Sequence, residues 1–561
     1  MSNKIKYSSN QLAKYIADAP GIVKNYIQSL EKQVGNLANI GLALSKEKNM
    51  SKLLEMILIE AKRIANSDGG TLYMMTDDNR LRFKIMMTDS LDFHMGGTSG
   101  KDIPFYPVKL YDEKGAPNKS MIAAYVALSG ETVNIPDAYK AKGFDFSGTK
   151  MFDEKTGYHS QSFLTVPLKN HEDEIIGVLQ LLNAQNQNTK KIIPFTSDIQ
   201  EMVEALASQA AVAITNKNLI KDLEALFESF IKLIASAIDA KSPYTGGHCA
   251  RVPEITMLLA KAVQDTIDGP FANISFTDKE MYELKIAAWL HDCGKVATPE
   301  FIVDKSTKLE TIYDRVNEVE TRFAALKRDA QINLLKRELK IERDDSLSKK
   351  EKLIKIKNLK SKYSKKLREL KSDLEFIKES NIGGEFMSGD KKDRVHNISN
   401  YHWKPNGKIE NFLSEDEVYN LTIPRGTLTA EERKVINDHI VVTINMLEEL
   451  PYPKHLRNVP EFAGGHHEKL DGTGYPKGLT KDEMSVQARI MAIADIFEAL
   501  TAKDRPYKKG KTLSQAMRIL GFMKNDAHID VDLFDIFVRD KIYLKYAEDY
   551  LDPDQIDEVQ I

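Results

Sequence analysis

The chain of 561 residues is too long for a single hydrophobic core, so we expect two or three domains. Its formal net charge of −3 gives no indication of a nucleic-acid polymer or a membrane surface as a partner, and its two cysteines argue against a disulfide framework. No apolar run approaches the roughly 20 residues that span a bilayer, and the first residues lack the apolar region of a signal peptide, which favours a cytoplasmic protein.

The N-terminal segment, residues 1–45, is predicted to contain one amphipathic helix over residues 22–44. Its apolar residues alternate four and three positions apart, which is the spacing of a short heptad seam. The residues that form this seam are Val23, Ile27, Leu30, Val34 and Leu37. We expect the segment to contribute to a homodimer.

Residues 46–217 have the pattern of an α+β sensor domain. A helix is predicted over residues 50–65, and strands are predicted where short runs rich in β-branched, aromatic and aliphatic residues lie between turns. These runs are SDGGTLYMM, RLRFKIMM, ETVNIPD, SFLTVPL and IIGVLQLLN. A sheet with helices segregated at its ends is an α+β arrangement.

The second half of this region resembles a GAF domain. The resemblance rests on FDEKTGYHSQSFLTVPLKNHEDEIIGVLQLLNAQN and, after it, ALASQAAVAITN. GAF domains bind small ligands or mediate dimerisation, and those that bind cyclic nucleotides carry an Asn-Lys pair at the end of the last strand, then a Phe and an Asp-Glu pair. Here Asn183 precedes Ala184, and Phe195 is followed by Asp198 and Ile199, so this pattern is half present. A cyclic nucleotide, another small ligand and a purely dimerising role all remain open.

Residues 218–241 are predicted to form a linker helix that continues without interruption from residue 198. The stretch contains no Pro or Gly, and its apolar residues again alternate four and three positions apart. This seam consists of Leu219, Leu223, Leu226, Phe230, Leu233 and Ala237. The spacing predicts a parallel homodimer that transmits a signal between domains; the alternative is an amphipathic helix that packs on its own chain.

Two separated segments, residues 242–309 and 426–535, are predicted to form one all-α domain. Residues 310–425 between them are predicted to form an inserted antiparallel helical hairpin and a loop, with RDDS (343–346) turning the chain. The second arm carries twelve Lys and Arg against four Asp and Glu between residues 349 and 378. Such a surface fits an acidic partner or nucleic acid, although a solvated coiled-coil face has the same composition. The acidic residues 536–561 are expected to form a C-terminal tail.

Nine of the twelve histidines follow residue 240, so we expect a metal or acid–base site in the C-terminal half. Five of them lie with two aspartates in the blocks YTGGHCARV, AAWLHDCGKVATPE, LTAEERKVINDHIVVT, and HHEKLDGTGYPKG with the later ARIMAIADIFEAL. An aspartate inside an apolar helix is costly unless it is paired. The candidate ligands are His248, His291, Asp292, His439, His466, His467 and Asp495. Such a nitrogen-rich set suits Fe, Mn, Zn, Ni or Co better than Mg or Ca, and a carboxylate bridging two ions suits phosphoryl displacement.

These blocks resemble HD-GYP domains, whose defining signature HHExxDGxGYP is filled at every fixed position by residues 466–476. The order and spacing of the other three blocks agree as well. HD-GYP domains are phosphodiesterases of cyclic di-GMP. The resemblance implies that His248, His291, Asp292 and Asp495 hold one metal, and that Asp292, His439, His466 and His467 hold a second, with Asp292 bridging.

The resemblance also implies a reaction. A hydroxide bound by two divalent transition metals, Fe or Mn ahead of Zn, Ni or Co, would open cyclic di-GMP to linear pGpG, under regulation by the GAF domain through the linker. Whether pGpG or GMP is the end product remains open. Lys295 would act with Asp292 and contact the scissile phosphate. Arg505 and Lys508 would bind phosphate oxygens, and Tyr475 would face the substrate or a partner.

The sequence departs from the family in two places. Members with a third metal carry a glutamate four residues before the first histidine; Tyr244 stands there, which favours two metals. The insertion separates KSTKL (305–309) from RGTLTAEE (425–432), where it would gate access or, like the GYP loop, bind a protein partner. Two alternatives remain open: a catalytically silent signalling adaptor, and an enzyme for a mixed cyclic GMP–AMP dinucleotide.

Overall fold

A computed structural model of the protein describes residues 37–241, 247–404, 407–503 and 510–560, together with residues 21 and 35. The chain forms two compact units, Met1–Leu226 and Phe227–Ile561. Most of the predicted N-terminal helix, residues 22–34 and 36, lies outside the described residues, while residues 37–46 are helical. None of the helices described has the length and apolar character needed to cross a membrane.

The first unit is built on one antiparallel sheet. Its strands are β1 (Ser67–Thr76), β2 (Arg80–Thr88), β3 (Phe93–Gly96), β4 (Val108–Lys109), β5 (Val133–Ile135), β6 (Phe163–Lys169), β7 (Ile175–Gln185) and β8 (Ile192–Ile193). Their order is β3-β2-β1-β7-β6-β5, with β4 beside β2 and β8 beside β7. All five predicted strands and the predicted helix, α3 (Met50–Ala65), are present. The strands that the sequence did not indicate, β3, β4 and β8, are too short for an alternating pattern to appear.

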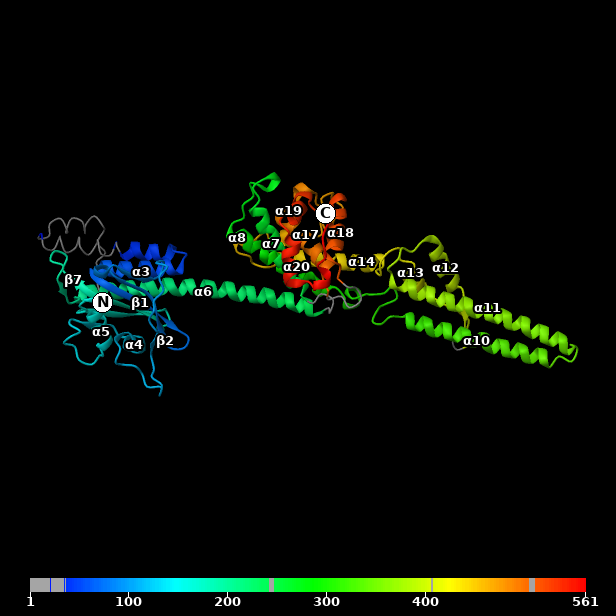
Figure 1. Ribbon diagram of the computed structural model, residues 1–561, viewed down its shortest axis with the longest axis horizontal. Coiled ribbons are helices and arrows are strands. Elements are labelled where there is room, and N and C mark those ends of the chain that lie inside the picture. The colour runs from blue at the N-terminus through cyan, green and yellow to red at the C-terminus, as the bar shows by residue number, and fades with distance from the viewer. Residues whose placement is uncertain are drawn as a thin grey trace, which may run out of the picture. The chain divides into compact units, whose positions relative to one another are not determined.

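Helices cover both faces of this sheet (Figure 1). Leu179 of β7 is buried with α3 and with the first half of α6 (Ser197–Lys241), whereas Val178 is buried with α4 (Ile122–Ser129) on the opposite face. Adjacent residues of a strand point to opposite faces, so β7 contributes to both layers of the core. The predicted α+β class of this unit is therefore confirmed.

Asn183, the one matching residue of the cyclic-nucleotide pattern at the end of β7, is used inside the fold. It has a φ of 54°, and its Oδ1 accepts a hydrogen bond from the backbone N–H of Gln161 at 2.7 Å. Its Nδ2 donates to the carbonyl of His159 at 2.8 Å. This side chain therefore fixes the segment that leads into β6.

Helix α6 contributes to the cores of both units. Val203 and Ala210 are buried in the first unit, and Ile231, Ala235 and Ile238 are buried in the second. The predicted long connecting helix is confirmed. Its last turns are not a free linker, because one of their faces packs in the core of the second unit.

The second unit has an all-α core with residues from both predicted halves. Its main helices are α7 (His248–Gln264), α8 (Asp278–Leu290), α15 (His439–Glu448), α16 (Val459–Gly464), α17 (Val486–Thr501), α18 (Leu513–Asn525), α19 (Val531–Arg539) and α20 (Ile542–Tyr550). Local sequence sets several helix starts. Thr277 and Glu280 form a capping box before α8, and Thr429 and Glu432 form another before α14 (Ala430–Asn437).

The predicted C-terminal tail, residues 536–561, differs from the structure. Tyr546 and Ala547 of α20 are buried in the helical core. Beyond α20, Gln555 donates from Nε2 to the carbonyls of Thr501 at 2.9 Å and Lys511 at 3.1 Å. The acidic composition concealed an amphipathic helix, because Ile542, Tyr546 and Ala547, spaced four and one positions apart, form one buried face.

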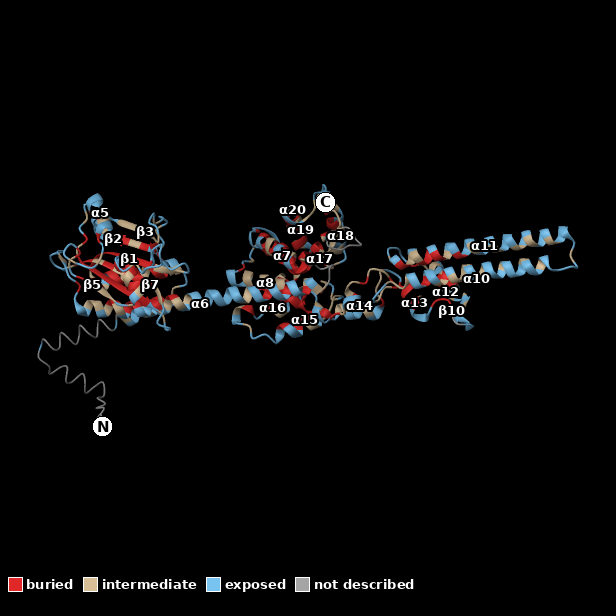
Figure 2. Cartoon of the chain, turned by 90° about the horizontal axis from the view of Figure 1, so that it is seen from below, coloured by how far each residue is buried: buried red, intermediate tan, exposed pale blue. Residues whose placement is uncertain are grey.

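The insertion contains the predicted hairpin and more. Helices α10 (Val316–Glu342) and α11 (Lys349–Ile382) run antiparallel, with Lys378 Nζ 2.9 Å from Glu320 Oε1 and Lys360 Nζ 3.4 Å from Glu338 Oε1. The predicted loop instead holds α12 (Gly389–Ser399), α13 (Glu415–Leu421) and the short strands β9 (His402–Trp403) and β10 (Glu410–Asn411). These elements share a small core with the base of the hairpin, while its distal arms are mostly exposed (Figure 2).

Candidate metal centre

The candidate site forms where several helix ends of the second unit meet. His248 begins α7, His291 and Asp292 follow α8, His439 begins α15, His466 and His467 follow α16, and Asp495 lies within α17. All seven predicted ligands are thus brought together. Five are buried, and His467 and Asp495 are half-buried.

One group of side chains gathers around Asp292 Oδ2. His248 Nε2 lies 3.2 Å from this oxygen and 3.2 Å from Asp495 Oδ1. His291 Nε2 lies 3.3 Å from Asp292 Oδ2 and 3.3 Å from His248 Nε2. Four potential ligand residues therefore point at one small volume.

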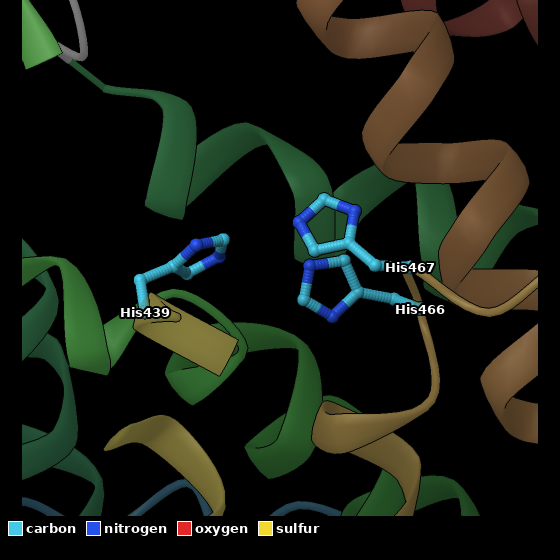
Figure 3. A group of neighbouring side chains, drawn as sticks. All are labelled: His439, His466 and His467. Carbon is cyan, nitrogen blue, oxygen red and sulfur yellow. The ribbon is translucent and has the colours of Figure 1, made fainter. Parts of the chain in front are cut away.

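A second group gathers on the other side of Asp292. His439, His466 and His467 turn their rings toward one another (Figure 3), with ring centroids 4.1 Å apart for His466 and His467 and 5.2 Å apart for His439 and His467. Asp292 Oδ1 lies 3.2 Å from His439 Nε2. The two oxygens of one buried carboxylate thus face two different sets of imidazoles.

Backbone carbonyls orient three of the imidazoles. The Nδ1 atom of His291 lies 2.8 Å from the Ala288 carbonyl, and Nδ1 of His466 lies 2.6 Å from the Ala463 carbonyl. His439 makes the same contact, at 2.5 Å, to the residue three positions earlier. Because Nδ1 faces a carbonyl, a neutral ring carries its proton there and its lone pair on Nε2, which points into the site, and this is the tautomer a metal ligand needs.

His248 is oriented by a carboxylate that the sequence did not single out. Its Nδ1 is hydrogen-bonded to Glu498 Oε2, and the other oxygen of Glu498 accepts from Arg251 Nε at 2.6 Å. Glu498 is fully buried on α17, three residues after Asp495. A spacing of three residues places Asp495 and Glu498 on one helix face, so the sequence could have indicated Glu498 as a neighbour of the site, although not its bond to His248.

The ligand atoms fit divalent transition-metal ions. Asp292 Oδ1, His439 Nε2 and His466 Nε2 are buried and accept no hydrogen bond from any residue that the structure describes. Such unpaired buried atoms are rare in folded proteins, and bound ions would satisfy them. Among the described residues, ligand atoms within 4.8 Å of one another occur in three groups: His439, His466 and His467; His248, His291 and Asp495; and His291, Asp292 and His466.

The two sets of imidazoles differ in their affinity for protons. Burial opposes protonation of His291, but the adjacent Asp292 and Asp495 outweigh it and raise its pKa to about 9. Burial likewise opposes protonation of His248, whose pKa is nevertheless raised well above its ordinary value, first by Glu498. On the other side, burial lowers the pKa of His467 to about 4 and that of His466 well below its usual range, where neighbouring histidines add to the effect.

We therefore expect metal binding at the His248 and His291 side to depend on pH more steeply than binding at the His466 and His467 side. A metal displaces protons from His248 and His291 below their raised pKa values, so affinity there rises with pH through the pKa of His291 at about 9. The pKa of His467 is lowered to about 4 and that of His466 is also well below its usual range, so both rings are already neutral near neutral pH and binding there releases no proton from them. Calorimetric titration in buffers of different ionisation enthalpy would measure the protons released by each metal equivalent. Equal release for the two equivalents would contradict this prediction.

The predicted substrate-binding residues are only partly described. Lys295 Nζ donates to Asp292 Oδ2 at 2.5 Å, and its side chain is 25% exposed, so the ammonium borders both the ligand cluster and solvent. Tyr475 stacks on His467 with ring centroids 4.9 Å apart. Arg505 and Lys508 lie outside the described residues, as does Tyr244.

The signature loop after the paired histidines is fixed by Glu468, which is buried and accepts from the backbone N–H of Lys477 at 2.7 Å. Gly472 has a φ of 76°, a conformation that favours glycine. A Cβ on Gly474 would lie 2.3 Å from the backbone nitrogen of Lys469. Both glycines are therefore required for the chain to turn back so soon after the ligands.

Two family models match the chain. One, described as a GAF domain, matches residues 49–214, and the other, described as an HD domain, matches residues 415–533. The chain contains a GAF domain and an HD domain. The HD match begins near the end of the insertion and includes His439, His466, His467 and Asp495, whereas His248, His291 and Asp292 precede the insertion.

Several curated proteins are similar to part of the chain. The 3′3′-cGAMP-specific phosphodiesterase 1 of Vibrio cholerae is 44% identical over 81 residues, which are 14% of this chain and 19% of the relative. A cyclic di-GMP phosphodiesterase of Pseudomonas aeruginosa is 43% identical over 74 residues, covering 13% and 17% of the two chains. That of Thermotoga maritima is 39% identical over 93 residues, covering 17% and 25%. The chain thus spans a quarter or less of the length of these relatives.

Proposed function

We propose that the HD domain is a metal-dependent phosphodiesterase that opens cyclic di-GMP to linear pGpG and then to GMP. The observation that carries the proposal is the position of Asp292 between two groups of buried imidazoles. A carboxylate that faces two ligand sets suits a pair of ions and in-line phosphoryl displacement. We propose two ions rather than three, with Fe or Mn as the native metals and Zn, Ni or Co as substitutes.

When bound, the metals would supply hydroxide at neutral pH by lowering the pKa of water. The chain's own groups have separate roles. Asp292 stays ionised, because Lys295 and the nearby histidines outweigh the effect of burial and hold its pKa well below the usual range. Lys295, at the solvent border of the cluster, would offset the negative charge that develops on the phosphoryl oxygens. Arg505 and Lys508 would hold the second phosphate of the substrate.

A direct comparison of two substrates would identify which cyclic dinucleotide the enzyme hydrolyses. The full chain, purified without oxygen and loaded with Mn or Fe, is incubated with cyclic di-GMP and with 3′3′-cGAMP in parallel, and the products are separated by chromatography. We expect faster turnover of cyclic di-GMP. Faster turnover of the mixed compound would instead support the mixed-dinucleotide enzyme. No turnover of either compound, with two metals confirmed bound, would leave the signalling adaptor.

We propose a cytoplasmic homodimer in which the GAF domain, with or without a small ligand, regulates the HD domain through α6. The predicted seam on α6 has no apolar cover from the described part of its own chain. Its exposed side chains are Leu219 at 48%, Leu223 at 63%, Leu226 at 53%, Phe230 at 55% and Leu233 at 63%. A second copy of the same stripe would bury these residues as a parallel coiled coil.

We expect Leu223→Arg to weaken the dimer by at least about 100-fold, because two unpaired guanidinium groups would face each other in the seam. Sedimentation velocity over a range of concentrations measures this change. Asn218→Arg is the matched control, since Asn218 is exposed on α6 but lies off the seam. A Leu223→Arg variant that remains as dimeric as the Asn218→Arg variant would exclude this interface.

A further inference from the structure

The last turn of α6 contacts the backbone of the candidate metal centre. Lys241, its final residue, is half-buried, and its Nζ donates to the carbonyls of Lys295 at 3.1 Å, Val296 at 2.6 Å and Thr298 at 2.6 Å. An ammonium group has three protons to donate, so three carbonyls satisfy it fully. No carboxylate is needed for this contact.

The three carbonyls belong to the turn that presents Lys295. This turn, η3 (Cys293–Ala297), starts immediately after Asp292. In the backbone of the turn, the N–H of Lys295 donates to the carbonyl of Asp292 at 2.9 Å, and the N–H of Thr298 donates to the carbonyl of Lys295 at 3.1 Å. Lys241 adds three further hydrogen bonds to the same stretch of backbone.

A second contact of the same helix turn reaches the backbone beside His248. The backbone N–H of Cys249, directly after His248, donates to Asp239 Oδ1 at 3.4 Å. Ile238, next to Asp239, is buried in the core of the HD domain. The end of α6 is thus anchored in the core and touches the backbone beside His248 and beside Lys295.

We propose that Lys241 is a positioning residue that ties the regulatory helix α6 to the catalytic turn, so that the position of α6 sets the position of Lys295. The proposal rests on the proposed phosphodiesterase function for its consequence, since Lys295 acts there on the phosphate. The link itself can be tested without that function, because the three ammonium hydrogen bonds join the end of α6 directly to the backbone of the turn.

The test uses Lys241→Met and Lys241→Arg in the full chain, with Lys232→Met as the matched control. Lys232 also lies on α6, and its side chain is 52% exposed. Its Nζ lies 5.9 Å from the centroid of the Trp289 ring and contacts Glu228, not the turn. Hydrogen exchange at the amides of residues 295–298 is measured in the metal-loaded protein. We expect about tenfold faster exchange in Lys241→Met, confined to this segment, with partial rescue in Lys241→Arg and wild-type rates in Lys232→Met.

Kinetics and metal content complete the test. We expect Lys241→Met to lower kcat for the dinucleotide more than it raises KM, with two metals still bound, because the turn would be displaced without loss of a ligand. Unchanged exchange at residues 295–298, or faster exchange throughout α7 and α17 as well, would overturn the proposal. If the wild-type chain hydrolyses no cyclic dinucleotide, the proposed function fails while the exchange result still decides the role of Lys241.

Discussion

Asp292→Asn is expected to lower the turnover of cyclic dinucleotide by at least about 100-fold, since changes to groups that merely support metal ligands already cost this much. Asparagine keeps the shape of the side chain but removes the charge. Both oxygens of Asp292 face imidazole nitrogens, at 3.2 Å for His248 and 3.2 Å for His439, so one substitution weakens both proposed metal positions. Metal content after gel filtration and turnover with excess Mn measure the two effects.

Asp471→Asn is the matched control for this substitution. Asp471 lies in the HHExxDGxGYP signature, is exposed, and accepts hydrogen bonds from the backbone N–H and the hydroxyl of Thr473, two residues later. We expect it to retain both metals and nearly full activity. An Asp292→Asn protein with two tightly bound metals would show that the carboxylate does not bridge, and one with full activity would refute the proposed role altogether.

Gly294→Ala is expected to destabilise the HD domain by about 3 kcal/mol, the upper part of the usual range for an added group in a packed core. A Cβ at this position would lie 2.0 Å from the His439 carbonyl oxygen and 2.6 Å from the Thr443 backbone nitrogen. The N–H of Gly294 also donates to Thr443 Oγ1 at 2.9 Å. The turn after Asp292 is therefore in backbone contact with the start of α15, and a methyl group would force the two apart together with their ligands.

Calorimetry of the full chain measures this loss as a fall of roughly 10 °C in the melting temperature of the HD domain. Gly521→Ala on α18 is the control, because a Cβ there would meet no atom within 4 Å. It should melt at or slightly above the wild-type temperature, since alanine is favoured over glycine within a helix. Melting of the Gly294→Ala variant at the wild-type temperature, with wild-type metal affinity, would mean that the turn and α15 can separate freely.

Much of the site could be predicted because its residue types are unusual where they stand. Asp292 and Asp495 interrupt apolar helical sequence, and carboxylates in such places need partners. The insertion leaves the order of the ligand blocks unchanged, because the chain leaves and rejoins the domain at one place. Lys305 Nζ, before the insertion, lies 2.8 Å from Glu432 Oε2, after it. The antiparallel hairpin was predicted, whereas the sequence indicated only a loop where the short helices α12 and α13, with 11 and 7 residues, lie.

By itself, the sequence determined which side chains could bind metal, the α+β and all-α classes of the two regions, and the continuous helix that joins them. These depend on residue type and local periodicity, which are properties of short stretches of chain. Only the tertiary structure decided that the two oxygens of Asp292 face different imidazole sets, that Glu498 orients His248, and that Lys241 holds the turn of Lys295. Each of these depends on atoms that are distant in sequence or on the direction of a side chain, and no local pattern encodes either.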